Sequence, residues 1–283
     1  MHPIAGIDHV ILGVRDLESA RRTWGRLGFT LSPRGRHVEQ PTANYCVMFA
    51  SDYIELLGMI GADVSGHRLG NFLGFREGLM GIAFAPLGSA EEARGALAER
   101  GLHPSAPRAL SRQIELPEGA ALPRFELVSL PPDETPGLDC FLCSHLTPEL
   151  MRRREWLDHP NGAAGLEAVH VLVDNTALLL PAYDRLFGIG QVTTTDAVAS
   201  ILIGHQRLVF STIDDFQTMH PGSEVDREFP LPGIVALEIA VARRDSTAAY
   251  LKEQQIAFSE LPDGAIAVPR GEANGAILLF REG

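Results

Sequence analysis

The sequence predicts an α+β protein built from four modules of the form βαβββ, arranged as two pairs. A glycine followed by an apolar residue opens a similar short pattern four times, at Gly6, Gly78, Gly165 and Gly233. Each copy begins a strand-like apolar run, and a helix-like segment follows within a few residues. The chain has 283 residues, a length that favours two cores over one. Two pairs of modules therefore fit the chain.

The first module shows the change from strand to helix periodicity most clearly. Residues 7–14 are strand-like, Asp16 is a candidate N-cap, and apolar residues then recur at helical spacing until Gly28. Two β-rich runs follow at residues 45–49 and 53–57, separated by a short polar stretch that suits a hairpin. The order of these elements predicts one complete βαβββ module.

The other three modules repeat this order with less internal detail. Their first strands are expected at 79–85, 166–173 and 234–241, and their helices at 89–100, 178–187 and 246–255. The interior of the second module gives no clear pattern before its closing apolar run at 140–143.

Two stretches fall outside the repeat. Residues 58–76 are rich in glycine and are expected to form a long loop, whereas 145–165 join the two pairs. The predicted organisation is a first pair at 1–145, a structured linker at 146–164 and a second pair at 165–283.

Alternation along the first strands separates two faces. One face is apolar in all four copies and is expected to pack under the helices, because alternate side chains of a strand point to opposite sides. The other face is mostly Gly and Ala, which leaves room for a ligand, and His9, His170 and Glu238 belong to it. His170 and Glu238 are expected to pair with each other rather than to form a second polar site.

Composition excludes several partners. A net charge of −12 argues against nucleic acid or an anionic membrane surface. The sequence lacks a run of about 18 apolar residues and a recognisable secretory signal, so a soluble cytoplasmic protein is expected. Three cysteines do not indicate a disulfide framework.

Several motifs resemble those of the vicinal oxygen chelate superfamily, which includes glyoxalases, bleomycin-resistance proteins and extradiol dioxygenases. They are an opening strand with Asp8-His9-Val10, a helix that ends in Leu27-Gly28-Phe29, and an acidic residue inside the closing strand 53–57. More narrowly, Arg36-His37, Thr42-Ala43-Asn44, His145 to Glu149 and His159 to Gly162 are similar to the family known as the glyoxalase-like domain. This resemblance implies that each pair forms a curved mixed sheet around a cavity.

The resemblance also implies a metal centre in the first pair. His9 and Glu55 occupy the two ligand positions of the superfamily, and Gly81 stands where a third ligand is usual, so His145 is the nearest candidate. Imidazole and carboxylate ligands suit a divalent ion such as Zn, Mn, Fe, Co or Ni. Glu55 is also the candidate catalytic base.

These residues imply a metal-dependent lyase or isomerase acting on a small oxygenated metabolite that is chelated through vicinal oxygens. Arg36, His37 and Asn44 are the candidate substrate-binding residues. Gly81 favours an alternative, a metal-free binding or sequestering protein of the bleomycin-resistance type. A ring-cleaving dioxygenase is a further alternative, although the closing strands of the second pair carry no acidic residue. The expected partner is a small-molecule substrate, and a homodimer is possible.

Overall fold

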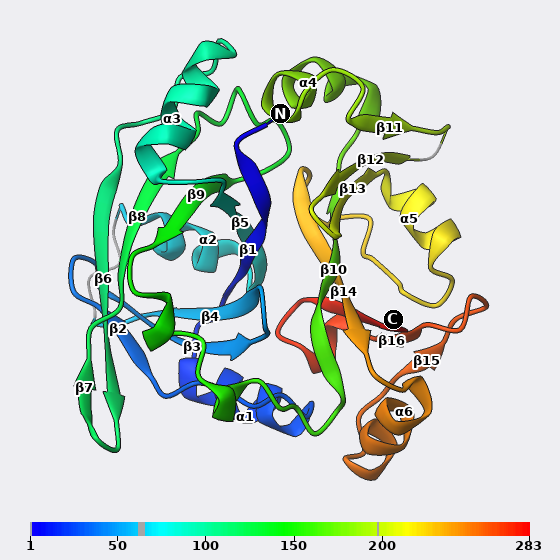
Figure 1. Ribbon diagram of the computed structural model, residues 1–283. Coiled ribbons are helices and arrows are strands. Elements are labelled where there is room, and N and C mark those ends of the chain that lie inside the picture. Colours follow the sequence, from blue (N-terminus) through cyan, green and yellow to red (C-terminus); the bar gives the residue numbers. More distant parts are fainter. Residues whose placement is uncertain (1, 62–65, 197) are drawn as a thin grey trace.

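The computed structural model describes residues 2–61, 66–196 and 198–283. Its strands form two sheets that lie side by side (Figure 1), one from residues 4–145 and the other from residues 163–282. The predicted α+β class is confirmed. No helix in the described part of the chain is long and apolar enough to cross a membrane.

The two sheets have the same strand order. In the first sheet the order is β2 (Gly35–His37), β3 (Thr42–Met48), β4 (Tyr53–Met59), β1 (Ile4–Gly13), β5 (Gly78–Pro86), β9 (Cys140–His145), β8 (Arg124–Ser129), β6 (Arg108–Leu116) and β7 (Gly119–Ala121). In the second it is β11 (Val192–Thr194), β12 (Val198–Ile203), β13 (Gln206–Ser211), β10 (Ala163–Leu172), β14 (Gly233–Val241), β17 (Ile277–Glu282), β16 (Ile266–Val268) and β15 (Ser259–Glu260). The repeat in the sequence is therefore a repeat of topology, with β7 as an addition.

Each module contributes one helix after its first strand. These helices are α1 (Leu17–Arg26), α3 (Ala90–Glu99), α4 (Leu180–Phe187) and α6 (Arg244–Glu253). Asp16 caps α1 as predicted, since its carboxylate accepts a hydrogen bond of 2.9 Å from the backbone N–H of Ser19. The linker contains two short 3₁₀ turns, Pro148–Leu150 and Arg154–Trp156.

The loop expected at 58–76 is partly wrong. Residues Arg68–Phe75 form helix α2, which His67 caps, and its Leu69 and Leu73 pack against Ile11 and Leu57. Glycines inside the helix obscured it in the sequence, but burial of its two leucines outweighs their low helix propensity. Residues 62–65 of the expected loop lie outside the described part of the chain. A further helix, α5 (Ile213–Met219), has the corresponding place in the second pair.

The first sheet closes on itself, whereas the second stays open. Strand β2, at one end of the strand order, pairs with β6, next to the other end, with Gly35 opposite Ile114 and His37 opposite Arg112. The two end strands of the second sheet are β11 and β15, and the described structure shows no pairing between them. Strand β15 has two residues. The first pair thus encloses a barrel-like interior.

The alternation of the first strands follows the predicted faces. Val10, Val171 and Ile239 are fully buried in one core that also contains Trp24 of α1 and Leu251 of α6. This core is continuous between the two pairs. His9 points to the opposite side, into the interior of the first sheet.

Candidate active site

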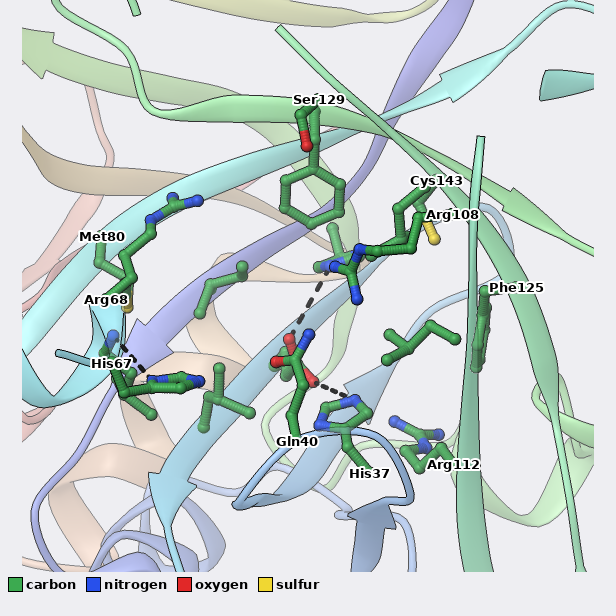
Figure 2. A pocket seen from close by; sticks show the side chains of 18 of the residues that line it. His37, Gln40, His67, Arg68, Met80, Arg108, Arg112, Phe125, Ser129 and Cys143 are labelled. Atoms are coloured by element: carbon green, nitrogen blue, oxygen red, sulfur yellow. Dashed lines mark hydrogen bonds and ion pairs between the residues drawn. The ribbon is translucent and has the colours of Figure 1, made fainter. Parts of the chain in front are cut away.

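A cavity of about 450 Å³ occupies the interior of the first sheet (Figure 2). Strands β1, β4, β6, β8 and β9 supply most of its wall, and the start of α2 contributes His67, Arg68 and Leu69. His9, His37 and Glu55 are the residues of the predicted site that line it. The cavity is therefore the place to test the predicted chemistry.

His9 is oriented by its neighbour Asp8. Strand β1 has a bulge between Ile7 and His9, so Asp8 is not paired regularly across β5 and its side chain can reach the His9 ring. The Asp8 Oδ2 lies 2.7 Å from His9 Nδ1 and 3.0 Å from His145 Nε2. Burial alone would raise the pKa of Asp8, but hydrogen bonds from His145 and His9 outweigh this effect and lower the pKa.

An ionised Asp8 can only accept hydrogen bonds, so His9 donates from Nδ1. In the neutral ring Nε2 carries the lone pair, and this atom lies 3.8 Å from Glu55 Oε2. The ring also stacks on Tyr53 at 4.4 Å between centroids. His9 thus presents a basic nitrogen in a fixed direction.

Glu55 is held from the opposite side by β2 and β3. Asn44 donates a hydrogen bond from Nδ2 to Glu55 Oε1 at 2.5 Å, and His37 Nε2 lies 3.9 Å from the same oxygen. His37 Nδ1 is 2.8 Å from the Thr42 hydroxyl. Burial lowers the pKa of His37 despite the opposing charge of Glu55, so the ring is neutral at pH 7.

The structure brings four of the predicted site residues together and separates two. His9, Glu55, His37 and Asn44 form one group around the Glu55 carboxylate. Arg36 alternates with His37 along β2 and is exposed, so it lies outside the cavity.

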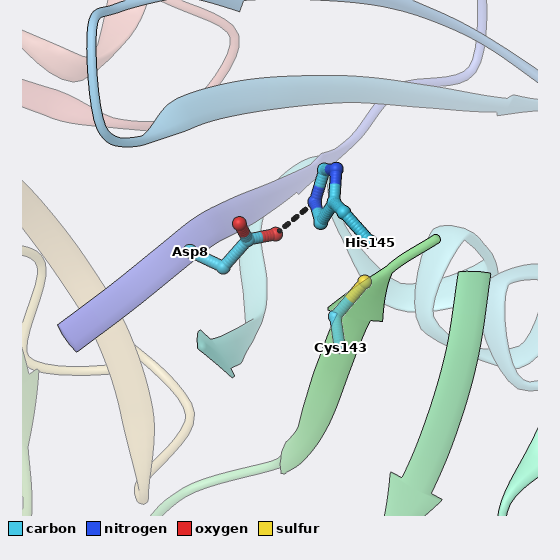
Figure 3. Close-up of side chains that lie close together, drawn as sticks. All are labelled: Asp8, Cys143 and His145. Atoms are coloured by element: carbon cyan, nitrogen blue, oxygen red, sulfur yellow. Dashed lines mark hydrogen bonds and ion pairs between the residues drawn. The ribbon is translucent and has the colours of Figure 1, made fainter. Parts of the chain in front are cut away.

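His145 does not face Glu55. Together with Cys143 it lies beside Asp8 (Figure 3), and the ligand atoms of these three residues lie within 4.8 Å of one another. Burial raises the pKa of the Cys143 thiol well above its usual value, so it is protonated at neutral pH. Arg152 adds a positive charge 3.6 Å from Asp8. The geometry therefore assigns His145 to the support of Asp8 and leaves His37 as the second imidazole at Glu55.

Gly81 lies at the position where the superfamily usually has its third metal ligand. A Cβ atom at this position would lie 3.1 Å from the Asp139 carbonyl oxygen and 3.2 Å from the guanidinium of Arg68. Arg68, which pairs with Asp139, therefore occupies the space that a longer side chain would need.

Arg112 is a cavity residue that the sequence did not single out. It is 2% exposed, and it lies opposite His37 in the β2–β6 ladder. The sequence signal was the alternation of Arg108, Leu110 and Arg112, which becomes visible only once β6 is known to be a strand.

The second pair contains a different polar cluster. His170 Nε2 lies 3.1 Å from Glu238 Oε1, as the sequence suggested, and His220 joins them in the described structure. Arg207 and Arg281 also approach the Glu238 carboxylate, at 3.2 and 3.3 Å. Burial and the neighbouring His170 lower the pKa of His220 to about 4. Two guanidinium groups already compensate the carboxylate, so this cluster is a buried ion-pair network.

The donor set of the cavity fits a divalent first-row metal ion. Two imidazoles and one carboxylate are ligands that such ions accept, and the second nitrogen of each imidazole is held by Asp8 or Thr42. His9, His37 and Glu55 would hold the ion.

Comparison with solved structures gives matches over almost the whole chain. A hypothetical protein from Staphylococcus aureus has a TM-score of 0.69 at 14% identity, covering 98% of this chain and 99% of the other. A variant of 4-hydroxymandelate synthase from Streptomyces coelicolor has a TM-score of 0.58 at 13% identity, covering 98% and 92%. A fusion of a xylose isomerase-like TIM barrel and 4-hydroxyphenylpyruvate dioxygenase has a TM-score of 0.55 at 11% identity, covering 100% of this chain and 50% of the other. These likenesses establish the fold.

The sequence matches no curated protein. A family described as "Glyoxalase-like domain" matches residues 7–187, which include every residue of the cavity. The match covers more than half of the chain, and the paired βαβββ modules of the structure agree with it. The chain belongs to the glyoxalase-like domain family.

Proposed function

We propose that the protein is a metal-dependent enzyme of the lyase or isomerase type, acting on a small metabolite that carries two neighbouring oxygens. The observation that carries the proposal is the convergence of His9 Nε2 and His37 Nε2 on the two oxygens of Glu55, at 3.8 and 3.9 Å. Both rings reach the carboxylate with the nitrogen that their own supporting hydrogen bonds leave free.

The residues of the cavity would have separate roles in such a reaction. A bound divalent ion would supply Lewis acidity to the vicinal oxygens of the substrate. Asn44 fixes one Glu55 oxygen through its amide, which leaves the other oxygen, Oε2, to alternate between holding the ion and exchanging a proton with a substrate in the cavity. The apolar side chains of Leu110, Phe125 and Leu127 exclude water from this region.

Metal binding tests the proposal directly. We expect the purified chain to bind one Mn²⁺ per molecule, measured by electron paramagnetic resonance. We expect Mn²⁺ affinity to fall by more than about 100-fold in each of His9→Ala, His37→Ala and Glu55→Gln. Loss of a residue that only supports a ligand typically lowers metal affinity by about 10- to 100-fold, and loss of the ligand itself should cost more. His103→Ala is the control, because that imidazole is largely exposed and pairs only with Glu134 among the described residues. Unchanged Mn²⁺ affinity in all three site variants would contradict the proposal.

Activity is tested by proton exchange. The Mn²⁺-loaded chain should incorporate deuterium from D₂O into hydroxyacetone at the carbon beside the carbonyl, measured by NMR, and Glu55→Gln should abolish incorporation.

A metal-free binding protein is the second candidate. The hydrogen bond from Asn44 to Glu55 favours it, because this contact satisfies part of the carboxylate without a metal. Absence of Mn²⁺ binding by the unmodified chain, with retention of small molecules in the cavity, would support this candidate instead.

A further inference from the structure

Strand β6 directs two arginines toward the cavity. Arg108, Leu110 and Arg112 alternate along this strand, and all three line the cavity wall. Arg108 is exposed at the rim, whereas Arg112 is buried beside His37 (Figure 2).

Arg112 lacks a charged hydrogen-bond partner in the described parts of the chain. Its Nη1 donates to the Cys46 sulfur at 3.0 Å and its Nη2 to the Met151 sulfur at 2.7 Å, while Nε has no partner there. Thioether and thiol sulfurs are weak acceptors. Burial raises the pKa of the Cys46 thiol to about 11, so Cys46 is neutral at pH 7.

The guanidinium nevertheless keeps its positive charge. Burial opposes ionisation, but the negative charges that Cys46, Tyr53 and Glu55 carry when ionised outweigh it and raise the pKa of Arg112, and of these three groups Glu55 is the one that is charged at pH 7. Glu55 is a carboxylate whose charge acts on Arg112, yet no ion pair within 4.0 Å joins Arg112 to a carboxylate in the described parts of the chain. A metal ion bound by Glu55 would pair with the negative charge of its carboxylate, and the cavity would then be more positive. Buried charges are normally paired, so the missing anion is expected from outside the chain.

We propose that the substrate carries a carboxylate, and that Arg112 binds it inside the barrel while the site at His9, His37 and Glu55 acts on the adjoining oxygens. This inference rests on the proposed function for the reacting end of the substrate. A single guanidinium matches the single charge of a carboxylate, whereas a phosphate monoester carries about two negative charges. Leu110, Phe125, Leu127 and Phe141 line the same cavity and accommodate a short apolar body.

The test compares hexanoate with hexanamide, which have nearly the same shape and differ in charge. Binding of each to the chain stripped of metal with EDTA is measured by ligand-observed NMR. We expect hexanoate to bind at least about tenfold more tightly than hexanamide, because only the carboxylate pairs with Arg112. Equal binding of the two probes, or stronger binding of hexyl phosphate than of hexanoate, would overturn the proposal.

Two variants assign the preference to one residue. Arg112→Met should lower hexanoate affinity by about 10- to 100-fold and leave hexanamide affinity within about threefold. Arg124→Met makes the same chemical change at an exposed position of β8 that does not line the cavity, and it should change neither affinity by more than about threefold. Unchanged hexanoate affinity in Arg112→Met would overturn the assignment. If Arg112→Met does not fold, as judged by circular dichroism, Arg112→Lys keeps the charge and should retain the preference for hexanoate; its loss would also count against the charge pairing proposed here.

The metal-free measurements separate this proposal from the proposed function. A chain that binds hexanoate through Arg112 but no Mn²⁺ would contradict the metal-dependent reaction alone. A chain that binds Mn²⁺ but does not distinguish hexanoate from hexanamide would contradict the carboxylate pocket alone.

Discussion

Asp8 connects two histidines with different surroundings. Its carboxylate accepts from His9, whose other nitrogen faces the cavity, and from His145, whose Nδ1 is buried without a partner in the described structure. The ionised carboxylate fixes which His9 nitrogen carries the proton, and an amide in its place could not accept in the same way.

Asp8→Asn should therefore weaken Mn²⁺ binding by about 10- to 100-fold without unfolding the protein, because the His9 nitrogen that faces Glu55 would lose its enforced lone pair. Affinity is measured between pH 6 and 8 by electron paramagnetic resonance. The control is Asp133→Asn, an exposed aspartate outside the cavity. Mn²⁺ affinity equal to that of the unmodified chain across this range would show that Asp8 does not position His9.

His220 makes folding sensitive to acid. Its pKa falls from 6.5 to about 4 in the folded chain, so between these values the unfolded state binds a proton that the folded state does not. The free energy of unfolding should then decrease as the pH falls from 6.5 to 4, by at most about 3 kcal/mol from this residue. His220→Phe, which keeps a ring against Phe216, should remove that part of the decrease. The measurement is urea unfolding at several pH values, with the exposed His103→Phe as control. Equal pH dependence in both variants would contradict the assignment.

At the scale of elements, the pairing of β2 with β6 assembles the site. It places His37 beside Arg112, and it requires a residue without a side chain at Gly35. A Cβ atom there would lie 2.4 Å from Asn44 Oδ1 and 2.6 Å from Arg112 Cδ. The Asn44 side chain, which holds Glu55, and the Arg112 side chain, which lines the cavity, therefore both pass directly over the Gly35 backbone.

Gly35→Ala should lower the free energy of unfolding by about 1–3 kcal/mol and weaken Mn²⁺ binding, because Asn44 or Arg112 must move. Gly25→Ala provides a matched control: it lies within α1, and a Cβ atom there meets nothing within 4 Å. That change should be neutral or stabilise the protein by up to about 1 kcal/mol. Thermal unfolding and Mn²⁺ titration of both variants test the difference, and a Gly35→Ala variant that matches Gly25→Ala in both would contradict the argument.

At the scale of the whole molecule, the two pairs of modules share one core and are joined by polar contacts. Gln206 of β13 reaches across to β1, where its side chain accepts from the Ile7 N–H at 2.6 Å and donates to the Ile7 carbonyl at 3.2 Å. Asp52 accepts from the Leu166 N–H at 2.9 Å in the same region. The second pair thus supports the strand that carries Asp8 and His9.

Gln206→Leu should destabilise the protein by about 1–3 kcal/mol for each Ile7 backbone group left without a partner. Gln113→Leu, an exposed position on β6, should change stability by less than about 0.5 kcal/mol.

Urea unfolding followed by tryptophan fluorescence and by circular dichroism should give coincident single transitions for the unmodified chain. Separate transitions for the two probes would show that the pairs fold independently.

The sequence by itself determined the four modules and the faces of their first strands, with His9 on the inner face. These features depend on periodicity within short segments, which local composition and side-chain alternation encode directly. Helix α2 was missed because burial of Leu69 and Leu73, and not propensity, stabilises it.

Only the tertiary structure decided which side chains meet. The bulge at Asp8 and the β2–β6 ladder depend on the register between strands that lie far apart in the sequence. For this reason His37 reaches Glu55, His145 turns to Asp8, and Arg112 enters the cavity. A shift of one residue in either ladder would direct these side chains to the other face, so no pattern within a single segment could have identified the site in full.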